Sequence, residues 1–274
     1  MPIIFKARTP EGYVLKILAE LLQNNLKTAC FEIDEKGIRL QQMDHHHTIL
    51  IDLDLDRTNF SIYKYRKSEK LIIGINLSHF YKMLKSVKKK DSLKLFIDDD
   101  HPTDFGIQII PNDTNRITTS FVKILNVQNL DTDLPMGYEK PVLVSSSEFQ
   151  KMCKGLTHIS PKTHISSKGF RISFASDADG VMKRSTDFGE TEDSDDEDDS
   201  KSHDEIEYSE EFETEQLTRI TKLAGLSKNM QIYPKRDNPL LFRAQIGTLG
   251  KISIYIKSKG LQEAESRSIE NGDV

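Results

Sequence analysis

The chain has 274 residues, of which 36% are hydrophobic, which is enough for the core of one large domain or two of ordinary size. Its two cysteines exclude a disulfide framework, no apolar run is long enough to cross a membrane, and we expect a soluble intracellular protein. The formal net charge of −5 hides an uneven distribution, because residues 190–215 hold 15 acids and one base, which leaves a net charge of +9 elsewhere.

Strand signals dominate, as short runs rich in β-branched and aromatic residues that end at turn residues. In chain order, strands are predicted at residues 29–33, 37–40, 48–55, 71–75, 92–97, 105–110 and 116–122, and then at 142–144, 170–174, about 181–186, 230–233, 240–246 and 251–256. Apolar side chains at helical spacing predict four helices, at residues 10–25, 77–89, 146–158 and 213–226.

Two pairs of segments indicate an internal duplication. Lys36-Gly-Ile-Arg-Leu40 resembles Lys168-Gly-Phe-Arg-Ile172, and residues 82–96 match residues 219–233 loosely, in the same order. Each half then has the order helix, strands, helix, strands, which predicts an α+β fold of two similar domains. We place these domains at 1–122 and 141–259, with an extended connector at 123–140, an acidic insert at about 187–215 and a flexible tail at 260–274.

Basic residues recur on one face of the predicted helices, away from the apolar stripe. Helical spacing groups Lys82, Lys85 and Lys89 on the second helix, and Lys151, Lys154 and His158 on the third. The first helix adds Lys16, and the fourth adds Arg219 and Lys222. Such faces, without interleaved aromatics, are typical of sequence-independent contact with phosphates, although lysines that only solvate a helix are the alternative.

No segment has the pattern of a catalytic or metal site. The three consecutive histidines at residues 45–47 would point alternately to opposite faces of a strand, which argues against a shared metal. Asp52, Asp54 and Asp56 fit the solvent face of a strand, although a metal-dependent nuclease remains a rival reading. We expect no cofactor, no metal and no enzymatic activity.

Residues 29–44 end in Leu40-Gln-Gln-Met-Asp44. In this they resemble the PCNA family of DNA sliding clamps, in which the corresponding segment ends in Leu-Gln-x-Met-Asp. Gly74-Ile-Asn-Leu-Ser78, leading into Lys82-Met-Leu-Lys85, is similar to the second helix of the family, and residues 148–159 resemble its third. The resemblance runs from about residue 5 to residue 259.

The resemblance implies a homotrimeric ring around double-stranded DNA, with antiparallel sheets outside and two helices of each domain on the inner face. Carried over by position, it implies DNA contacts at Lys16, Lys82, Lys85, Arg116, Lys151, Lys154, His158 and Lys222. It also implies a pocket for client proteins with a PIP box, a short motif with aromatic anchors, formed by Met43, His47, Val127, Leu130, Leu134, Pro135, Pro239 and Tyr255. The connector supports this pocket, because its spaced apolar residues need an apolar surface, although they could simply pin the connector to the body.

The expected function is that of a processivity factor for DNA polymerase. The expected partners are DNA polymerase, a clamp loader, flap endonuclease and ligase, in the nucleus or at a cytoplasmic viral replication site. A subunit of a heterotrimeric checkpoint clamp and a monomeric factor that holds DNA by charge alone are the alternatives. The acidic segment and the ending Ile256-Lys-Ser-Lys259 depart from the family pattern, which suits a large DNA virus or a divergent eukaryote.

Overall fold

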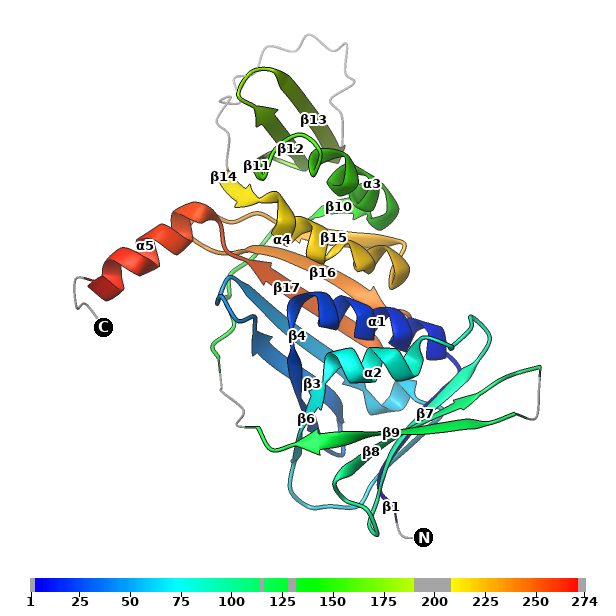
Figure 1. Ribbon diagram of the computed structural model, residues 1–274. Coiled ribbons are helices and arrows are strands. Elements are labelled where there is room, and N and C mark those ends of the chain that lie inside the picture. Colours follow the sequence, from blue (N-terminus) through cyan, green and yellow to red (C-terminus); the bar gives the residue numbers. More distant parts are fainter. Residues whose placement is uncertain (1–2, 114–115, 128–131, 190–207, 271–274) are drawn as a thin grey trace. The chain divides into compact units, whose positions relative to one another are not determined.

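The computed structural model describes residues 3–113, 116–127, 132–189 and 208–270 (Figure 1). They form two compact units, one from residues 1–133, 225–227 and 244–254, and the other from residues 134–224, 228–243 and 255–274. The acidic run for which an outer loop is expected, residues 190–204, lies outside the described residues. No helix in the described part is long and apolar enough to cross a membrane.

The first unit is an antiparallel sheet with two helices on one of its faces. In sequence order, its elements are β1 (Ile3–Thr9), α1 (Gly12–Asn25), β2 (Thr28–Ile33), β3 (Gly37–Met43), β4 (Ile49–Asp56), η1 (Arg57–Asn59), β5 (Ile62–Tyr65), β6 (Leu71–Asn76), α2 (Leu77–Leu84), β7 (Ser92–Asp98), β8 (Asp104–Ile110) and β9 (Thr118–Leu125). Its strands follow the order β17-β4-β3-β2-β6-β9-β8-β7-β1-β5, where β17 is Gly250–Ile256.

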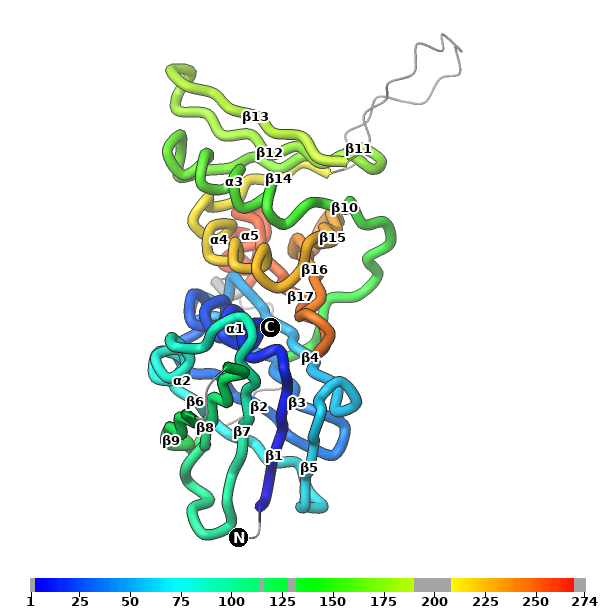
Figure 2. Tube along the Cα trace, turned by 90° about the vertical axis from the view of Figure 1, so that its right-hand side faces the viewer, coloured from blue at the N-terminus to red at the C-terminus, as the bar shows by residue number. Residues whose placement is uncertain are grey.

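The core of this unit lies between the sheet and the helices. Helix α1 buries Leu15, Leu18 and Leu22 at helical spacing, and α2 buries Phe80 and Leu84. Figures 1 and 2 both show the two helices next to each other on the same side of the strands. The opposite side of each helix is therefore left for solvent or for a ligand.

The second unit repeats this plan. Its elements are β10 (Val142–Ser145), α3 (Ser146–Leu156), β11 (Lys162–Lys168), β12 (Arg171–Ala178), β13 (Met182–Gly189), β14 (Tyr208–Glu213), α4 (Thr214–Arg219), η2 (Thr221–Gly225), β15 (Asn229–Tyr233), β16 (Leu240–Ile246) and α5 (Lys259–Glu270). One sheet has the order β13-β12-β11-β14, and β10-β15-β16 are neighbours in the other.

The duplication predicted from the sequence is visible in the strand order. The series β4-β3-β2-β6 of the first unit has its counterpart in β13-β12-β11-β14, and β1-β7-β8 has its counterpart in β10-β15-β16. The two similar pentapeptides lie at equivalent hairpins, β2–β3 and β11–β12. Because Gly169 has φ +55°, the second hairpin needs a residue that tolerates the left-handed region.

Three predicted helices end earlier in the structure than the sequence suggests. The extension of α2 to residue 89 is wrong, because α2 ends at Leu84 and the backbone N–H of Lys88 donates to the Asp91 carboxylate instead (2.9 Å). Helix α3 ends at Leu156, so the predicted segment to residue 158 is too long. The predicted fourth helix is broken at Ile220, between α4 and η2.

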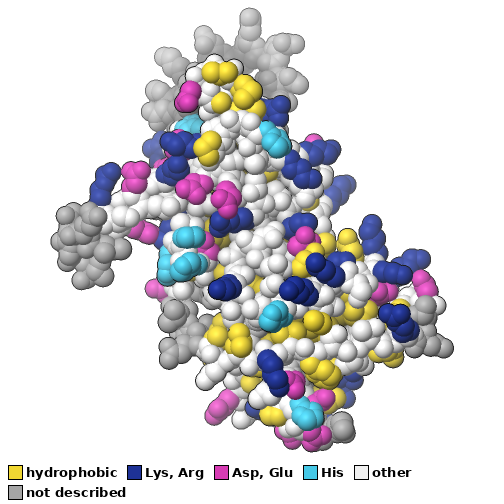
Figure 3. Space-filling view, in the orientation of Figure 1, with side chains coloured by type: hydrophobic (Ala, Val, Ile, Leu, Met, Phe, Trp, Pro, Cys, Tyr) yellow, Lys and Arg dark blue, Asp and Glu magenta, His cyan; other side chains and the backbone are white. Residues whose placement is uncertain are grey.

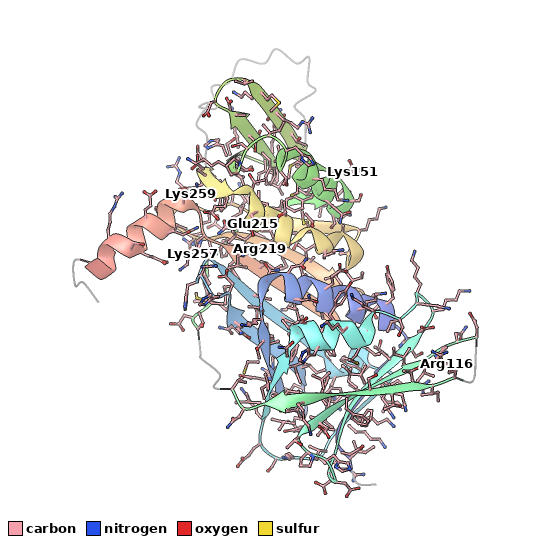
Figure 4. The ribbon with its side chains drawn as sticks, in the orientation of Figure 1. Arg116, Lys151, Glu215, Arg219, Lys257 and Lys259 are labelled. Atoms are coloured by element: carbon pink, nitrogen blue, oxygen red, sulfur yellow. The ribbon has the colours of Figure 1, made fainter. Side chains whose placement is uncertain are left out.

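The C-terminal segment also differs from the expected flexible tail. Residues Lys259–Glu270 form α5, whose N-terminal part contacts β14. Lys257 forms an ion pair with Glu265 (2.6 Å), and Lys259 forms one with Glu211 (3.5 Å; Figure 4). Strands β1, β5, β11 and β14 were not predicted, because charged or polar residues interrupt their apolar pattern.

Candidate nucleic-acid interface

The helical face of the first unit exposes two of the predicted basic residues. Lys82 lies in the last turn of α2, and Lys85 follows as its C-cap residue. The Lys85 ammonium is 5.7 Å from the centre of the Tyr81 ring, a cation–π distance. In Figure 3, Lys and Arg side chains lie over the surface of these helices with few acidic side chains between them. This face therefore presents positive charge to solvent.

Lys16 has a second role that its spacing did not reveal. Its Nζ donates to the backbone oxygens of Lys85 (2.7 Å) and Val87 (3.1 Å), the carbonyls that follow the early end of α2. A lysine near a helix C-terminus satisfies carbonyls that have no partner within the helix. The Lys16 ammonium therefore connects α1 to the end of α2. A phosphate that bound Lys16 would share this ammonium with the two carbonyl oxygens.

Two predicted contacts of this unit lie off the helices. Lys89 is exposed in the turn between α2 and β7, so its placement on the helical face is wrong, for the reason given above. Arg116 is exposed just before β9, and Figure 4 shows it at the tip of the β8–β9 hairpin, away from α1 and α2. Neither residue shares a helical face with Lys82.

The second unit presents a more mixed helical face. Lys151 and Lys154 are exposed on α3, but Lys151 pairs with Glu148 (2.7 Å). Arg219 pairs with Glu215 at the same distance, and Figure 4 labels both residues on α4. Exposed ion pairs of this kind are weak, so a phosphate could replace either carboxylate. Helix α3 is joined to η2, which follows α4, by a hydrogen bond from Gln150 to the Thr221 carbonyl (3.1 Å).

His158 and Lys222 lie outside the regular α-helices. His158 is exposed in the turn after α3, and Lys222 is half-buried in η2. His158 also lines a cavity of about 610 Å³ with Lys162, Glu215 and Lys259, among others. The lining mixes both signs of charge, since it contains Glu213 and Glu215 as well as the two lysines, and both lysines already pair with Glu211 outside the lining. No group of three His, Cys, Asp or Glu side chains suited to a metal occurs within the described residues.

The predicted client-binding residues are divided between the two units. Met43, His47 and Val127 belong to the first unit, and the second contains Leu134, Pro135, Pro239 and Tyr255; Leu130 lies outside the described residues. In the second unit, the Tyr138 hydroxyl donates to the Pro239 carbonyl (2.7 Å), and its ring centre is 6.0 Å from that of Tyr255. Tyr138 thus connects two residues of the predicted pocket.

The comparisons with known proteins match this fold over nearly its whole length. The model of the proliferating cell nuclear antigen (PCNA) N-terminal domain matches residues 4–134, and the model of its C-terminal domain matches residues 135–259. The chain belongs to the PCNA family. The boundary between the two matches falls within the connector predicted at 123–140, and PCNA membership makes this chain a DNA sliding clamp, a processivity factor for DNA polymerase.

Individual relatives agree with the PCNA assignment. A protein named "Probable DNA polymerase sliding clamp 1", from Paramecium bursaria Chlorella virus 1, is 26% identical over 261 residues, which are 93% of this chain and 96% of that protein. The crystal structure of PCNA from Entamoeba histolytica has a TM-score of 0.79 and 18% identity, and the match covers 94% of this chain and 99% of that one. This structural likeness supports the two-domain α+β clamp fold.

Tyr138, Glu148 and Glu215 were not singled out from the sequence. The two glutamates precede their basic partners by three and four residues, so a search for i,i+3 and i,i+4 pairs would have found them. The sequence contains one indication for Tyr138, namely that it is an aromatic residue in the otherwise polar connector of this PCNA-family chain. Its partners Pro239 and Tyr255 are about 100 residues away in the sequence, so no local pattern identifies them.

The double contact of Lys16 predicts a measurable effect on stability. We expect Lys16→Met to lower the free energy of unfolding by about 1–2 kcal/mol, because it removes a charged donor from two carbonyls. Urea unfolding of the purified protein measures the change. Lys82→Met is the matched control on the same face, and it should change stability by less than about 0.5 kcal/mol. Equal stability of the two variants would show that the Lys16 contact contributes nothing to folding.

Proposed function

We propose that this chain assembles into a homotrimeric ring that encircles double-stranded DNA and holds DNA polymerase on its template. The proposal rests on two strand edges, one along most of β9 and one of β13, that have no neighbouring strand among the described residues. Strand β9 pairs with β8 on one side, and over Thr118–Lys123 no strand within the described residues covers its other side. Strand β13 pairs with β12 alone among the described strands.

The side chains at these edges support pairing between copies. At β9, Phe121 is 55% exposed, and Ile117, just before the strand, is 54% exposed. At β13, Met182 is 49% exposed, and Val181, just before the strand, is 83% exposed. Open edges with exposed apolar side chains are sites of association by strand addition. Because the two edges differ, β9 of one copy would pair with β13 of the next. Such head-to-tail contacts close into rings when the rotation allows it.

The ring needs no base recognition to hold DNA. We propose that Lys16, Lys82, Lys85, Arg116, Lys151, Lys154, His158, Arg219 and Lys222, with Lys89 nearby, contact phosphates without sequence preference. Phosphate contacts of this kind position a protein on DNA and carry no sequence information. A clamp loader would open the ring, and the protein itself would act as a non-enzymatic scaffold at the site of replication, in the nucleus or in viral factories.

A topological test separates this proposal from its rivals. The protein is loaded onto a nicked circular plasmid by an ATP-driven clamp loader and isolated by gel filtration. We expect it to elute with the circle and to be released when the plasmid is cut once. Retention after linearisation at low salt, followed by loss as salt rises, would favour a monomeric factor held by charge. A purified chain that stays monomeric until other clamp subunits are added would favour a heterotrimeric checkpoint clamp.

We further propose that client proteins with a PIP box, such as flap endonuclease and ligase, dock in the second unit beside Tyr138, whose ring packs against Tyr255. Leu134 and Pro135 are partly exposed in the extended segment before Tyr138, and Met136 is 81% exposed. Tyr255 is only 4% exposed, and its ring packs against Tyr138, so a client protein would contact Tyr138 rather than Tyr255 itself. A client aromatic anchor would therefore pack on Tyr138 and Pro135, and Met43, His47 and Val127 remain predicted contacts.

This docking site predicts a loss of peptide affinity. We expect Tyr255→Ala to weaken a PIP-box peptide by about 1–3 kcal/mol, because it removes the ring on which Tyr138 rests. Isothermal titration calorimetry measures the affinity, and circular dichroism checks that the protein is folded. Tyr255→Phe keeps the ring and is the control that should bind normally. Full affinity in a folded Tyr255→Ala variant would exclude this surface as the client site.

A further inference from the structure

The solvent face of the first unit's sheet carries a cluster of basic residues that are not among the predicted DNA or client contacts. Strands β5, β1 and β7 lie side by side, with Lys6 opposite Lys64 and Arg8 opposite Lys94. Because side chains alternate along a strand, these four residues share one face of the sheet. The opposite face carries Phe5, Ala7 and Leu95, which are buried in the core. We call the four cations the basic sheet face.

None of the four cations forms an ion pair with any residue that the structure describes. Like charges directly opposite each other on neighbouring strands destabilise a sheet. Here Lys6 faces Lys64, and Arg8 faces Lys94. Burial and then the charge of Lys6 lower the pKa of Lys94, and Asp98 opposes this effect only in part. The arrangement therefore costs stability in the free protein, and an anionic ligand would relieve that cost.

The ring of Phe96 lies beneath one of these charges, the Lys94 ammonium. The Lys94 ammonium is 4.6 Å above the centre of the Phe96 ring, and Phe96 lies over Gly106 of β8. A Cβ atom at Gly106 would be 2.4 Å from the Phe96 ring, so only glycine permits this position. The Lys94 side chain is thereby held against the sheet rather than extended into solvent.

The amide next to Lys94 on β8 is already occupied. Gln108 of β8 is opposite Lys94, and its amide donates to the Thr119 hydroxyl of β9 (3.0 Å). The face therefore presents charge but no free amide to read a base edge. With strands about 4.8 Å apart, the three strands give a patch about 10 Å wide, which fits one phosphate backbone.

We propose that the basic sheet face binds the phosphate backbone of a single strand of nucleic acid, without sequence preference. The family supports a nucleic acid over an acidic peptide, because a DNA sliding clamp works where the single-stranded template is exposed. This contact is separate from the encircled duplex, since it uses the sheet strands and none of the residues predicted on the helices. The contact would hold the unpaired strand beside the clamp.

The test uses a fluorescent oligothymidylate of about 20 nucleotides and the full-length chain. Because a short strand can also contact the helical lysines, all measurements are made in a Lys82→Gln, Lys85→Gln, Lys151→Gln, Lys154→Gln background. The test variant adds Lys6→Gln, Arg8→Gln and Lys64→Gln. The matched control adds Lys36→Gln, Arg57→Gln and Lys70→Gln, which removes the same residue types from elsewhere on this unit.

Fluorescence anisotropy at several salt concentrations gives the affinity and its salt slope. We expect the test variant to lose about two units of slope, since single strands give about 0.7 units for each phosphate contact. Its melting temperature should stay the same or rise, because like charges have been removed, whereas a purely structural role would lower it. The control variant should bind as its parent does.

Two results would overturn the proposal. Equal salt slopes for the test and control variants would show that the basic sheet face makes no phosphate contact. Stronger binding of a fluorescent polyglutamate peptide than of the oligonucleotide, lost in the test variant, would make this face a site for acidic peptides. Both outcomes leave the plasmid-linearisation test unaffected, so failure here is distinguishable from failure of the ring proposal.

Discussion

Charge reversal at Lys82, Lys85, Lys151 and Lys154 should abolish processive synthesis on a primed circle while leaving the fold intact. All four side chains are exposed on helices or their caps, and none is tied to a backbone carbonyl as Lys16 is. Each phosphate contact with duplex DNA contributes about 0.9 units of salt slope. Loss of four contacts therefore removes about 3.6 units of slope, so the affinity of the variant falls roughly 100-fold less between 50 and 200 mM salt, and reversal of charge adds repulsion that weakens binding further.

The four lysines should not contribute equally. Lys151 is paired with Glu148, so its charge is already partly neutralised, whereas no ion pair of Lys154 occurs in the described part of the chain. We expect Lys154→Glu to shorten the products of DNA polymerase more than Lys151→Glu does. Product length on a primed single-stranded circle, with clamp loader and polymerase, measures this directly.

A matched variant keeps the processivity test specific. Lys36→Glu, Lys70→Glu, Lys168→Glu and Lys251→Glu change the net charge equally at exposed positions away from the four helices. This variant should support processive synthesis. If neither quadruple variant shortens the products, the helical lysines do not form the DNA contact. If both variants shorten them to the same length, the effect comes from net charge and the assignment is likewise refuted.

Phe121→Asp should keep the chain monomeric, because it blocks the proposed contact between β9 and β13. Phe121 is 55% exposed beside the open edge of β9, and a carboxylate there would be buried unpaired in the proposed contact. Met182→Asp at the edge of β13 should have the same effect. Light scattering should give a mass near 31.3 kDa for each variant, and three times that mass for the unmodified chain.

Mixing the two variants tests which edges meet. A β9–β13 contact is head-to-tail, so the intact β13 of Phe121→Asp can pair with the intact β9 of Met182→Asp. The mixture should form a heterodimer, and each variant alone should stay monomeric. If the contact joined two β9 edges, Met182→Asp would still self-associate and mixing would add nothing. Ile72→Asp on β6 is the control, because this residue is 44% exposed on an interior strand.

The sequence alone identified most elements, the duplication and the family. The apolar spacing of Phe80 and Leu84 in α2, and of Phe149 and Cys153 in α3, is a local pattern, and burial on one side of each helix produced it. The resemblance around Leu40 and Asp44 led to the PCNA family, which the two domain matches confirmed. The helix patterns and the family motif can be recognised from the sequence because each depends on residues that are close together along the chain.

Tertiary structure decided where the helices end and what the charged side chains contact. Helix α2 ends at Leu84. The ammonium of Lys16 on the preceding helix donates to the carbonyl oxygens of Lys85 and Val87, just beyond that end. The basic sheet face joins strands β1, β5 and β7, which are separated by many residues in the sequence and meet only through pairing. Long-range strand register brings such groups together, and a sequence pattern contains information only about groups that are close along the chain.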